Sequence, residues 1–277
     1  MKKKFNLVGN TFTHLSGGNK GYSVHGKESK YVEWVQDGSG YDTFFVDDAM
    51  KMADQYERKS GAFKFGWLLE SKWISPMANE VRANPYRWLG KLDFIFTHDK
   101  ELLAVSDKFK FVPAQGSWID TNFVPPHPKP KLVSMIASKK NFTDGHRVRL
   151  EWAEKLRGQL DLYGRGFNQI ERKEEGLFDY MFSVAIENGQ YETYFTEKIL
   201  DCFLSFTVPI YLGAPDIGDH FNMDGIIVLT DDFDVSQLSE ERYWSMTDAI
   251  CDNYRRAKEM EVLEDYIWEH YFRSIIQ

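Results

Sequence analysis

Residues 182–221 read FSVAIENGQYETYFTEKILDCFLSFTVPIYLGAPDIGDHF, and this stretch is the most informative about the fold of the second half of the chain. It contains two apolar runs separated by a polar loop, and the second run, 208–212, ends in a glycine turn as buried parallel strands do. Between the runs, Thr196 and Glu197 precede apolar residues at helical spacing, which predicts an N-cap and a first helical turn. Lys198 would then lie beside unpaired backbone N–H groups, where phosphate binds readily. Spacing alone fits an ordinary capped β-loop-α-β unit equally well.

Strand and helix patterns alternate along the rest of the chain. The predicted strands are 43–46, 65–69 and 94–97, then 132–137, 162–164, 181–186, 208–212 and 226–229. The predicted helices are 47–59, 79–91, 147–160 and 196–206, and residues 239–277 have a mostly helical pattern. Such alternation is typical of parallel sheets with helices around them. Residues 124–130 contain four prolines and predict an extended linker between two halves.

We therefore expect a first domain over residues 1–125, a second over 126–245, and a helical tail over 246–277 that packs across both. The chain of 277 residues is long enough for two packed cores, with 43% hydrophobic and 16% aromatic residues.

Charge and cysteine content exclude several classes of function. The balance of 34 basic and 42 acidic residues gives a net charge of −8, which argues against a general nucleic-acid or anionic-membrane surface. Two cysteines, Cys202 and Cys251, cannot build a disulfide framework, and we expect them to be reduced. The N-terminal residues lack the apolar run of a signal peptide, and no stretch predicts a membrane-spanning helix.

The ordered set of residues around 182–213 resembles the donor-site signature of glycosyltransferase family 10, the α-1,3/1,4-fucosyltransferases. The matching positions are Phe182, Glu187, Asn188, Tyr194, Thr196, Glu197, Lys198, Val208, Pro209 and Gly213. The likeness continues upstream through residues 131–134, 147–149 and 163–165, so that it covers residues 130–240, and it is thin before them.

This resemblance implies an α/β fold of the GT-B type, in which two Rossmann-like domains face a cleft. It also implies an inverting transfer of L-fucose from GDP-fucose to a hydroxyl of an oligosaccharide acceptor, with no cofactor and no essential metal. Animal members of the family carry a Golgi anchor, so this chain is more similar to a cytoplasmic microbial or viral form. The acceptor, the linkage position and the oligomeric state are left open.

The resemblance also suggests roles for single residues. Lys198 would contact phosphate, Glu197 would accept hydrogen bonds from ribose hydroxyls, and Asn188 with Tyr194 would hold the diphosphate and sugar. Arg149 or Arg147 would supply a second positive charge, and the spacing does not decide between the two. The remaining expected donor-binding residues are Arg165, Glu187 and Thr196.

An inverting transfer needs a base that removes the acceptor proton. Glu70 follows an apolar strand in the first domain, and the family places a glutamate shortly after a strand there, so Glu70 is the expected base. His98 and Asp99, which follow the next strand, are the competing candidates.

The acidic pattern Asp232-Phe233-Asp234 has the D-x-D form that binds a divalent metal in another class of glycosyltransferases. Because it follows a late strand, we expect these residues to cap a loop instead. Two functional alternatives remain beside fucosyl transfer. The same scaffold could use another nucleotide sugar, or the chain could be an inactive glycan-binding protein.

Overall fold

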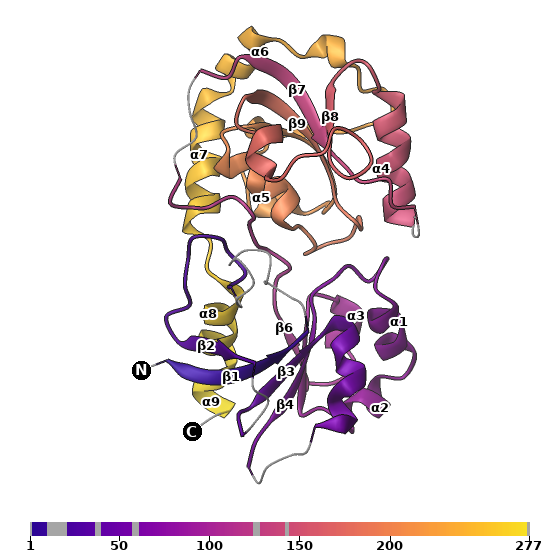
Figure 1. Cartoon of the computed structure of the whole chain (residues 1–277), viewed down its shortest axis with the longest axis vertical. Helices are drawn as coiled ribbons and strands as arrows, with labels where there is room; N and C mark the ends of the chain where they lie inside the picture. Colours follow the sequence, from indigo (N-terminus) through magenta and orange to yellow (C-terminus); the bar gives the residue numbers. More distant parts are fainter. Residues whose placement is uncertain are drawn as a thin grey trace. The chain divides into compact units, whose positions relative to one another are not determined.

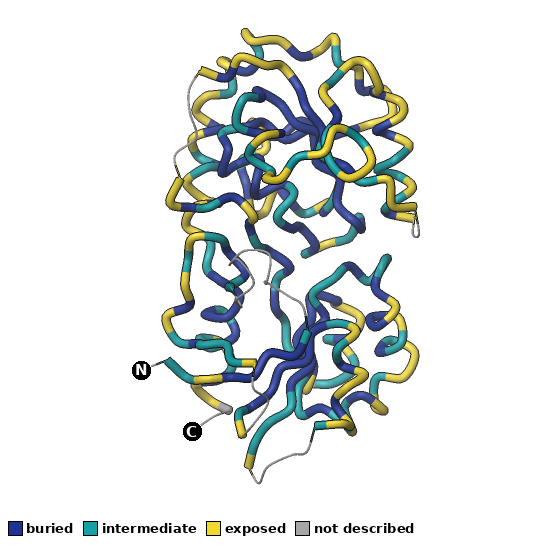
Figure 2. Tube along the Cα trace, in the orientation of Figure 1, coloured by how far each residue is buried: buried dark blue, intermediate teal, exposed yellow. Residues whose placement is uncertain are grey.

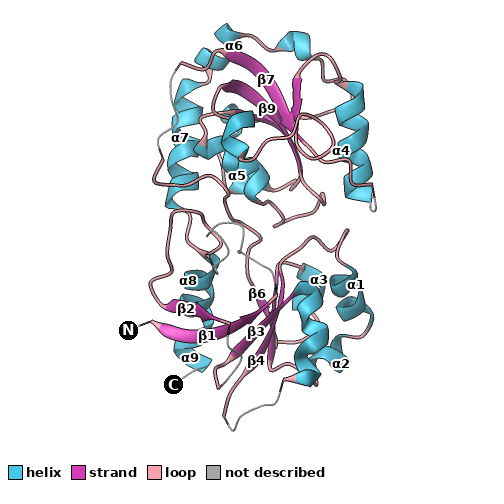
Figure 3. Ribbon diagram, viewed as in Figure 1, coloured by secondary structure: helices cyan, strands magenta, loops and turns pink. Residues whose placement is uncertain are grey.

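The computed structural model describes residues 2–9, 21–36, 40–56, 61–123, 128–141 and 144–275. The chain forms two compact units: unit 1 comprises Met1–Ala114 and Glu261–Gln277, and unit 2 comprises Gln115–Met260. Each unit is built on a parallel sheet with helices around it (Figure 1; Figure 3). Within the described ranges, no helix is both long and apolar enough to cross a membrane.

These boundaries differ from the expected ones at both ends of unit 2. Residues 115–119 belong to unit 2 because Ile119 packs in its core and the backbone N–H groups of Trp118 and Ile119 donate to Asp201. The expected tail is divided, since residues up to Met260 belong to unit 2 and residues from Glu261 onward to unit 1. The predicted proline linker falls partly on residues 124–127, which lie outside the described residues.

Unit 1 contains a sheet of strand order β2-β1-β3-β4-β5-β6, in which every neighbouring pair is parallel. Its strands are β1 (Lys3–Val8), β2 (Val32–Val35), β3 (Thr43–Val46), β4 (Lys64–Leu68), β5 (Phe94–Thr97) and β6 (Phe109–Phe111). Its helical elements are the 3-10 helix η2 (Asp47–Gln55), α1 (Pro76–Ala83), α2 (Pro85–Leu89), α3 (Lys100–Leu103), α8 (Leu263–Ile267), the π-helical turn η7 (Trp268–Phe272) and α9 (Arg273–Ile275).

Side chains that alternate along the unit 1 strands form two cores, one on each face of the sheet. Phe44 and Phe65 pack with Phe272 and other residues of the C-terminal segment on one face. Phe45 and Ile95 pack on the other face with the residues of η2, α1, α2 and α3. The central strands β3, β4, β5, β9 and β10 are among the most buried parts of the chain (Figure 2).

The helix predicted over residues 79–91 is two helices, α1 and α2. Asn84 has φ −141° and ψ 60°, which is not helical, and Pro85 occupies the first position of α2. Proline lacks a backbone N–H and disfavours a helical residue before it, so it begins a new helix here instead of continuing the old one.

Unit 2 contains a parallel sheet of strand order β11-β10-β9-β7-β8. Its strands are β7 (Lys131–Ile136), β8 (Asp161–Tyr163), β9 (Tyr180–Ile186), β10 (Val208–Leu212) and β11 (Ile227–Val228). Its helices are α4 (Asp144–Lys155), α5 (Glu197–Leu204), α6 (Glu240–Ser245) and α7 (Thr247–Glu259), with 3-10 turns η3 (Lys173–Gly176), η4 (Ile217–Asp219), η5 (Met223–Gly225) and η6 (Val235–Gln237).

The unit 2 sheet lies between two apolar layers. On one face, Val184 and Ile210 pack with Trp152 of α4 and Tyr243 of α6. On the other face, Ala185 and Tyr211 pack with the apolar residues of α5. The chain runs from β7 outward to β8 and then returns to place β9 on the other side of β7. In open parallel sheets, ligands bind at the carboxyl ends of the strands where the order reverses, so the ends of β7 and β9 are the place to look for a site.

Candidate active site

The loop between β9 and α5 is closed by a buried carboxylate. Glu187 directly follows β9, and its Oε1 accepts from the Thr196 backbone N–H at 2.8 Å while its Oε2 accepts from the Thr196 hydroxyl at 2.7 Å. The Glu187 side chain is fully buried. Burial raises its pKa, and the charge of Lys198, with Nζ 3.5 Å from Oε2, opposes that rise. Through these two hydrogen bonds to Thr196, Glu187 fixes the start of α5.

Gly213, at the end of the V-P-x-x-x-G pattern, allows Glu187 to occupy this position. A Cβ atom at Gly213 would lie 2.6 Å from Cγ of Glu187 and 2.2 Å from the hydroxyl of Tyr211. Both distances are far below a normal van der Waals contact, so the turn after β10 accepts no side chain unless the buried carboxylate moves.

Helix α5 begins at the expected cap, Thr196, and is anchored by its apolar face. Ile199, Leu200 and Phe203 are each at most 3% exposed. Full burial of such side chains contributes about 1.5–3 kcal/mol each. This packing holds the first turn in place and leaves Glu197 and Lys198 partly accessible, with 22% and 20% of their side chains exposed.

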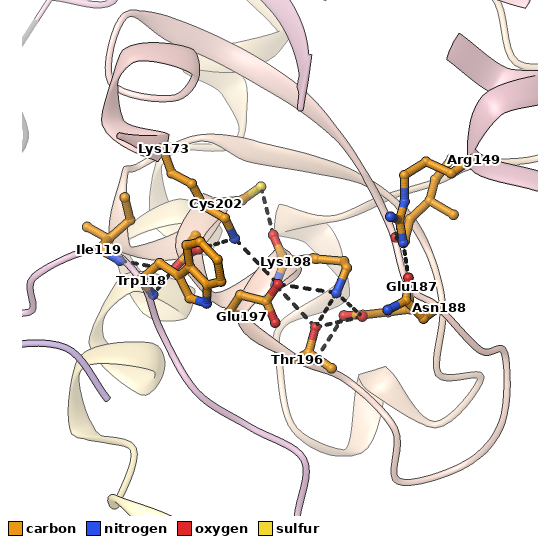
Figure 4. A network of polar contacts seen from close by, with 12 residues as sticks. Trp118, Ile119, Arg149, Lys173, Glu187, Asn188, Thr196, Glu197, Lys198 and Cys202 are labelled. Atoms are coloured by element: carbon orange, nitrogen blue, oxygen red, sulfur yellow. Dashed lines mark hydrogen bonds and ion pairs between the residues drawn. The ribbon is translucent and has the colours of Figure 1, made fainter. Parts of the chain in front are cut away.

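Lys198 and Glu197 form a charged pair at the helix start (Figure 4). The Lys198 Nζ lies 3.2 Å from Oε1 of Glu197 and donates to the Thr196 hydroxyl oxygen at 3.1 Å. Burial raises the pKa of Glu197, but the charges of Lys198 and Lys173 outweigh burial and hold that pKa below its ordinary value. Glu197 is thus an ionised acceptor beside an ammonium group, a combination suited to hydroxyl and phosphate groups of one ligand.

Arg149 of α4 joins this group at the end of β9. Its Nη2 donates to the Ile186 carbonyl at 3.1 Å and also to Oδ1 of Asn188. The close approach depends on Gly145, where a Cβ atom would lie 2.3 Å from the Asn188 carbonyl oxygen. The Nε of Arg149 also donates to the Ile186 carbonyl at 3.3 Å, so the planar guanidinium is oriented at the end of β9.

Arg147, two residues earlier on α4, lies in a different environment. Its side chain is 55% exposed and pairs with Asp144, which is 78% exposed. The sequence does not decide between Arg147 and Arg149, and the structure places Arg149 beside Asn188.

In unit 1, three neighbouring strands end in polar residues. Glu70 follows β4; it is partly buried, and its Oε1 accepts from the Ser71 N–H at 2.9 Å. Asp47 follows β3, and its Oδ1 accepts from the N–H groups of Leu69 and Glu70 at 3.0 and 3.2 Å. Burial, with a further contribution from the charge of Glu70, raises the pKa of Asp47 to about 7.

The two competitors of Glu70 are both buried. His98 is 2% exposed, and burial lowers its pKa to about 4. Asp99 is 3% exposed and pairs with Lys72 at 3.3 Å, with Arg82 at 3.5 Å, and with the N–H of Glu101 as the cap of α3. Of Glu70, His98 and Asp99, only Glu70 is partly exposed.

Residues 126–256, which lie inside unit 2, match the C-terminal region of glycosyltransferase family 10 (fucosyltransferase). This segment is a family 10 glycosyltransferase domain. A stretch of 66 residues is 39% identical to the α-(1,3)-fucosyltransferase FucT of Helicobacter pylori and covers 24% of this chain and 14% of that relative. The shared stretch is thus a small part of the relative's length.

The fold extends the likeness beyond the family 10 domain. A crystal structure of an α1,3-fucosyltransferase aligns with a TM-score of 0.51 at 16% identity, over 94% of this chain and 81% of that one. The match spans both units and confirms the α/β fold of two Rossmann-like sheets that the sequence predicts.

Within the family 10 domain, the structure separates the expected donor residues into two groups. Asn188, Arg149, Glu197 and Lys198 lie together around the end of β9 and the start of α5. Glu187, Thr196 and Tyr194 are 1%, 6% and 1% exposed, so they support the site from inside the protein. Tyr194 stacks on Tyr191 with ring centroids 4.8 Å apart.

Arg165 follows β8 and Gly164. It is exposed in the turn after β8, and its carbonyl oxygen accepts from the Lys139 N–H at 3.0 Å. The resemblance suggests Arg165 as a donor residue, and among the described residues no contact of its side chain with Arg149, Asn188, Glu197 or Lys198 is found, so its role stays a prediction.

The sequence reasoning missed Lys173 and Asp201, which contact each other at 2.8 Å in the same domain. A signal was present, because Asp201 is a charged residue within the apolar stripe of α5 and lies one helical turn after Glu197. Two acids of like charge at this spacing repel each other unless a cation lies between them.

The acidic D-x-D pattern caps loops, as expected. Asp234 is the N-cap of η6, and its side chain accepts from the Ser236 N–H at 2.7 Å. In the part of the chain that the structure describes, no three His, Cys, Asp or Glu side chains are grouped to hold a metal ion. Both cysteines are free, Cys202 being buried and Cys251 exposed.

Proposed function

We propose that this protein transfers L-fucose from GDP-fucose to a hydroxyl group of an acceptor glycan, with inversion at the anomeric carbon and without an essential metal. One observation carries the proposal: Arg149, Lys198 and Glu197 converge at the carboxyl edge of a parallel sheet inside a family 10 glycosyltransferase domain. This is the place and the chemistry that a nucleoside diphosphate requires.

In the proposed reaction the chain supplies positive charge to the leaving group. As the bond between the anomeric carbon and the β-phosphate oxygen breaks, its electron pair leaves with GDP. Lys198 and Arg149 stabilise the diphosphate through charge-assisted hydrogen bonds, while Glu197 accepts from the ribose hydroxyls. Two side-chain cations make the step feasible without a divalent ion.

The acceptor proton goes to Glu70. The acceptor oxygen forms its bond to the anomeric carbon on the face opposite the leaving diphosphate, and the Glu70 carboxylate takes the proton that this oxygen loses. The partial exposure of Glu70, against the burial of His98 and Asp99, supports this assignment over its two competitors.

The test is a turnover assay with GDP-fucose in the presence of EDTA, with and without a panel of galactose- and N-acetylglucosamine-containing acceptors. We expect GDP release that the acceptor stimulates and a fucosylated product in the mass spectrum. Lys198→Ala is the matched inactive control. Turnover of a UDP-sugar in place of GDP-fucose would assign the scaffold to another donor, and nucleotide binding without transfer would indicate a glycan-binding protein.

A further inference from the structure

Lys173 reaches the start of α5 from η3, far away in the sequence. Its Nζ lies 2.8 Å from Oδ2 of Asp201 and 3.5 Å from Oε1 of Glu197, and 17% of its side chain is exposed (Figure 4). The Lys173 ammonium group also lies 4.6 Å from the ring centroid of Trp118. A lysine that is held by two carboxylates and an aromatic face has little freedom to move.

Asp201 anchors this lysine. Its side chain is 1% exposed, and its Oδ1 accepts from the N–H groups of Trp118 and Ile119 at 2.8 and 3.2 Å. Oδ2 is then directed to Lys173. Because two backbone N–H groups fix Oδ1 of the buried Asp201, the carboxylate is oriented so that Oδ2 holds the Lys173 ammonium in place.

Glu197 has two cationic neighbours with different surroundings. Lys198 is 3.2 Å from Oε1 of Glu197, but in the proposed function it must turn to the diphosphate. Lys173 is paired with the buried Asp201, so we expect it to stay in place when a ligand arrives. It can hold the Glu197 carboxylate ionised and oriented in the complex, when the other lysine is engaged.

We infer that Lys173 is a positioning residue that holds Glu197 for recognition of the nucleotide ribose, with Asp201 as its anchor. The inference rests on the proposed function, since it needs Glu197 to accept from ribose hydroxyls. Lys173 lies outside the donor motif, and its replacement should specifically weaken recognition of the ribose hydroxyls.

The test compares GDP with 2′,3′-dideoxy-GDP by titration calorimetry. The wild-type protein should bind the dideoxy nucleotide about tenfold more weakly or worse, because charge-assisted hydrogen bonds to Glu197 are lost. Lys173→Met should bind GDP about tenfold more weakly than the wild type does. Its Kd for dideoxy-GDP should stay within about twofold of the wild-type Kd for dideoxy-GDP. Lys173→Arg should restore most of the discrimination.

Two further variants make the result decisive. Lys258→Met, on the exposed side of α7, should match the wild type with both nucleotides. Lys173→Gln keeps an N–H donor for Asp201 without the charge, so it tests the same point if the methionine variant does not fold. Equal weakening of both nucleotides in the Lys173 variants, or no change in either, would overturn the inference. Absence of GDP binding by the wild type would instead overturn the proposed function.

Discussion

Replacing Arg149 with methionine should weaken GDP binding, whereas the same change at Arg147 should not. The two arginines lie two residues apart on α4, so they share helix, sequence context and charge. They differ in surroundings: Arg149 donates to the Ile186 carbonyl and to Asn188 at the end of β9, and Arg147 forms an exposed pair with Asp144.

The expected magnitude follows from this difference. A hydrogen bond between charged partners in a partly buried site contributes about 1.5–3 kcal/mol. At 1.4 kcal/mol per factor of ten, loss of the Arg149 contact should raise the Kd for GDP by about 10- to 150-fold. Arg147 is 55% exposed, and exposed ion pairs contribute about 0.2–1 kcal/mol, so its variant should stay within about fivefold.

The assay is isothermal titration of GDP into each variant at fixed pH and ionic strength, with thermal denaturation of the unliganded proteins as a check on folding. Arg149→Lys is the intermediate case, because it keeps a charge but cannot bond Ile186, Asn188 and phosphate with one planar group. Equal losses for the two methionine variants, or a larger loss for Arg147, would refute the assignment of Arg149 to the diphosphate.

Three further predictions follow from the same contacts. Glu70→Gln should lower kcat by about 100-fold or more and leave the Kd for GDP unchanged, as steady-state kinetics and calorimetry would show; retention of near-wild-type turnover would exclude Glu70 as the base. The native pKa of Asp47 is raised to about 7 from 3.8, so the native state binds the extra proton and stability should fall as pH rises from about 4 to about 7. Asp47→Asn keeps an acceptor for the two backbone N–H groups but carries no charge. Urea denaturation should show this variant to be more stable than the wild type at pH 8, by up to about 4 kcal/mol, and no more stable at pH 4. An equal gain in stability at both pH values would contradict the burial argument. Gly145→Ala should cost about 1–3 kcal/mol of stability and weaken GDP binding, because the new Cβ would lie 2.3 Å from the Asn188 carbonyl oxygen, whereas Gly90→Ala, with 3.4 Å to its nearest neighbour, should be nearly neutral in the same melts.

The central strands were predictable because their apolar runs are continuous. Residues 43–46, 94–97 and 208–212 form β3, β5 and β10 with the expected bounds, and Thr196 caps α5 as its position before an acid and an apolar stripe indicates. Parallel strands that are buried on both faces have such continuous apolar sequences.

The edge strands β2 and β6 of the unit 1 sheet, and β1 beside β2, were not predictable in the same way. β1 begins with Lys3 and Lys4, and β2 and β6 are four and three residues long. Their place in the sheet depends on pairing with distant segments, such as Lys3 with Val32, and not on a local pattern.

The site was predictable where the motif is local and missed where its partners are distant. The spacing of Glu197 and Asp201 indicates a cation between them, but nothing in the sequence indicates that this cation is Lys173, 28 residues from Asp201. Asp47 is not among the site residues that the sequence predicts, whereas the structure holds it at φ 46°, a left-handed conformation that is unusual for a non-glycine residue. The choice between Arg147 and Arg149 likewise needed the tertiary contact with Asn188.

A crystal structure of the protein bound to GDP would test the proposed donor site. We expect the diphosphate within hydrogen-bonding distance of Lys198 Nζ and the Arg149 guanidinium, and the ribose hydroxyls on the Glu197 carboxylate. A nucleotide bound elsewhere, or bound at the start of α5 with its ribose turned away from Glu197, would contradict the account.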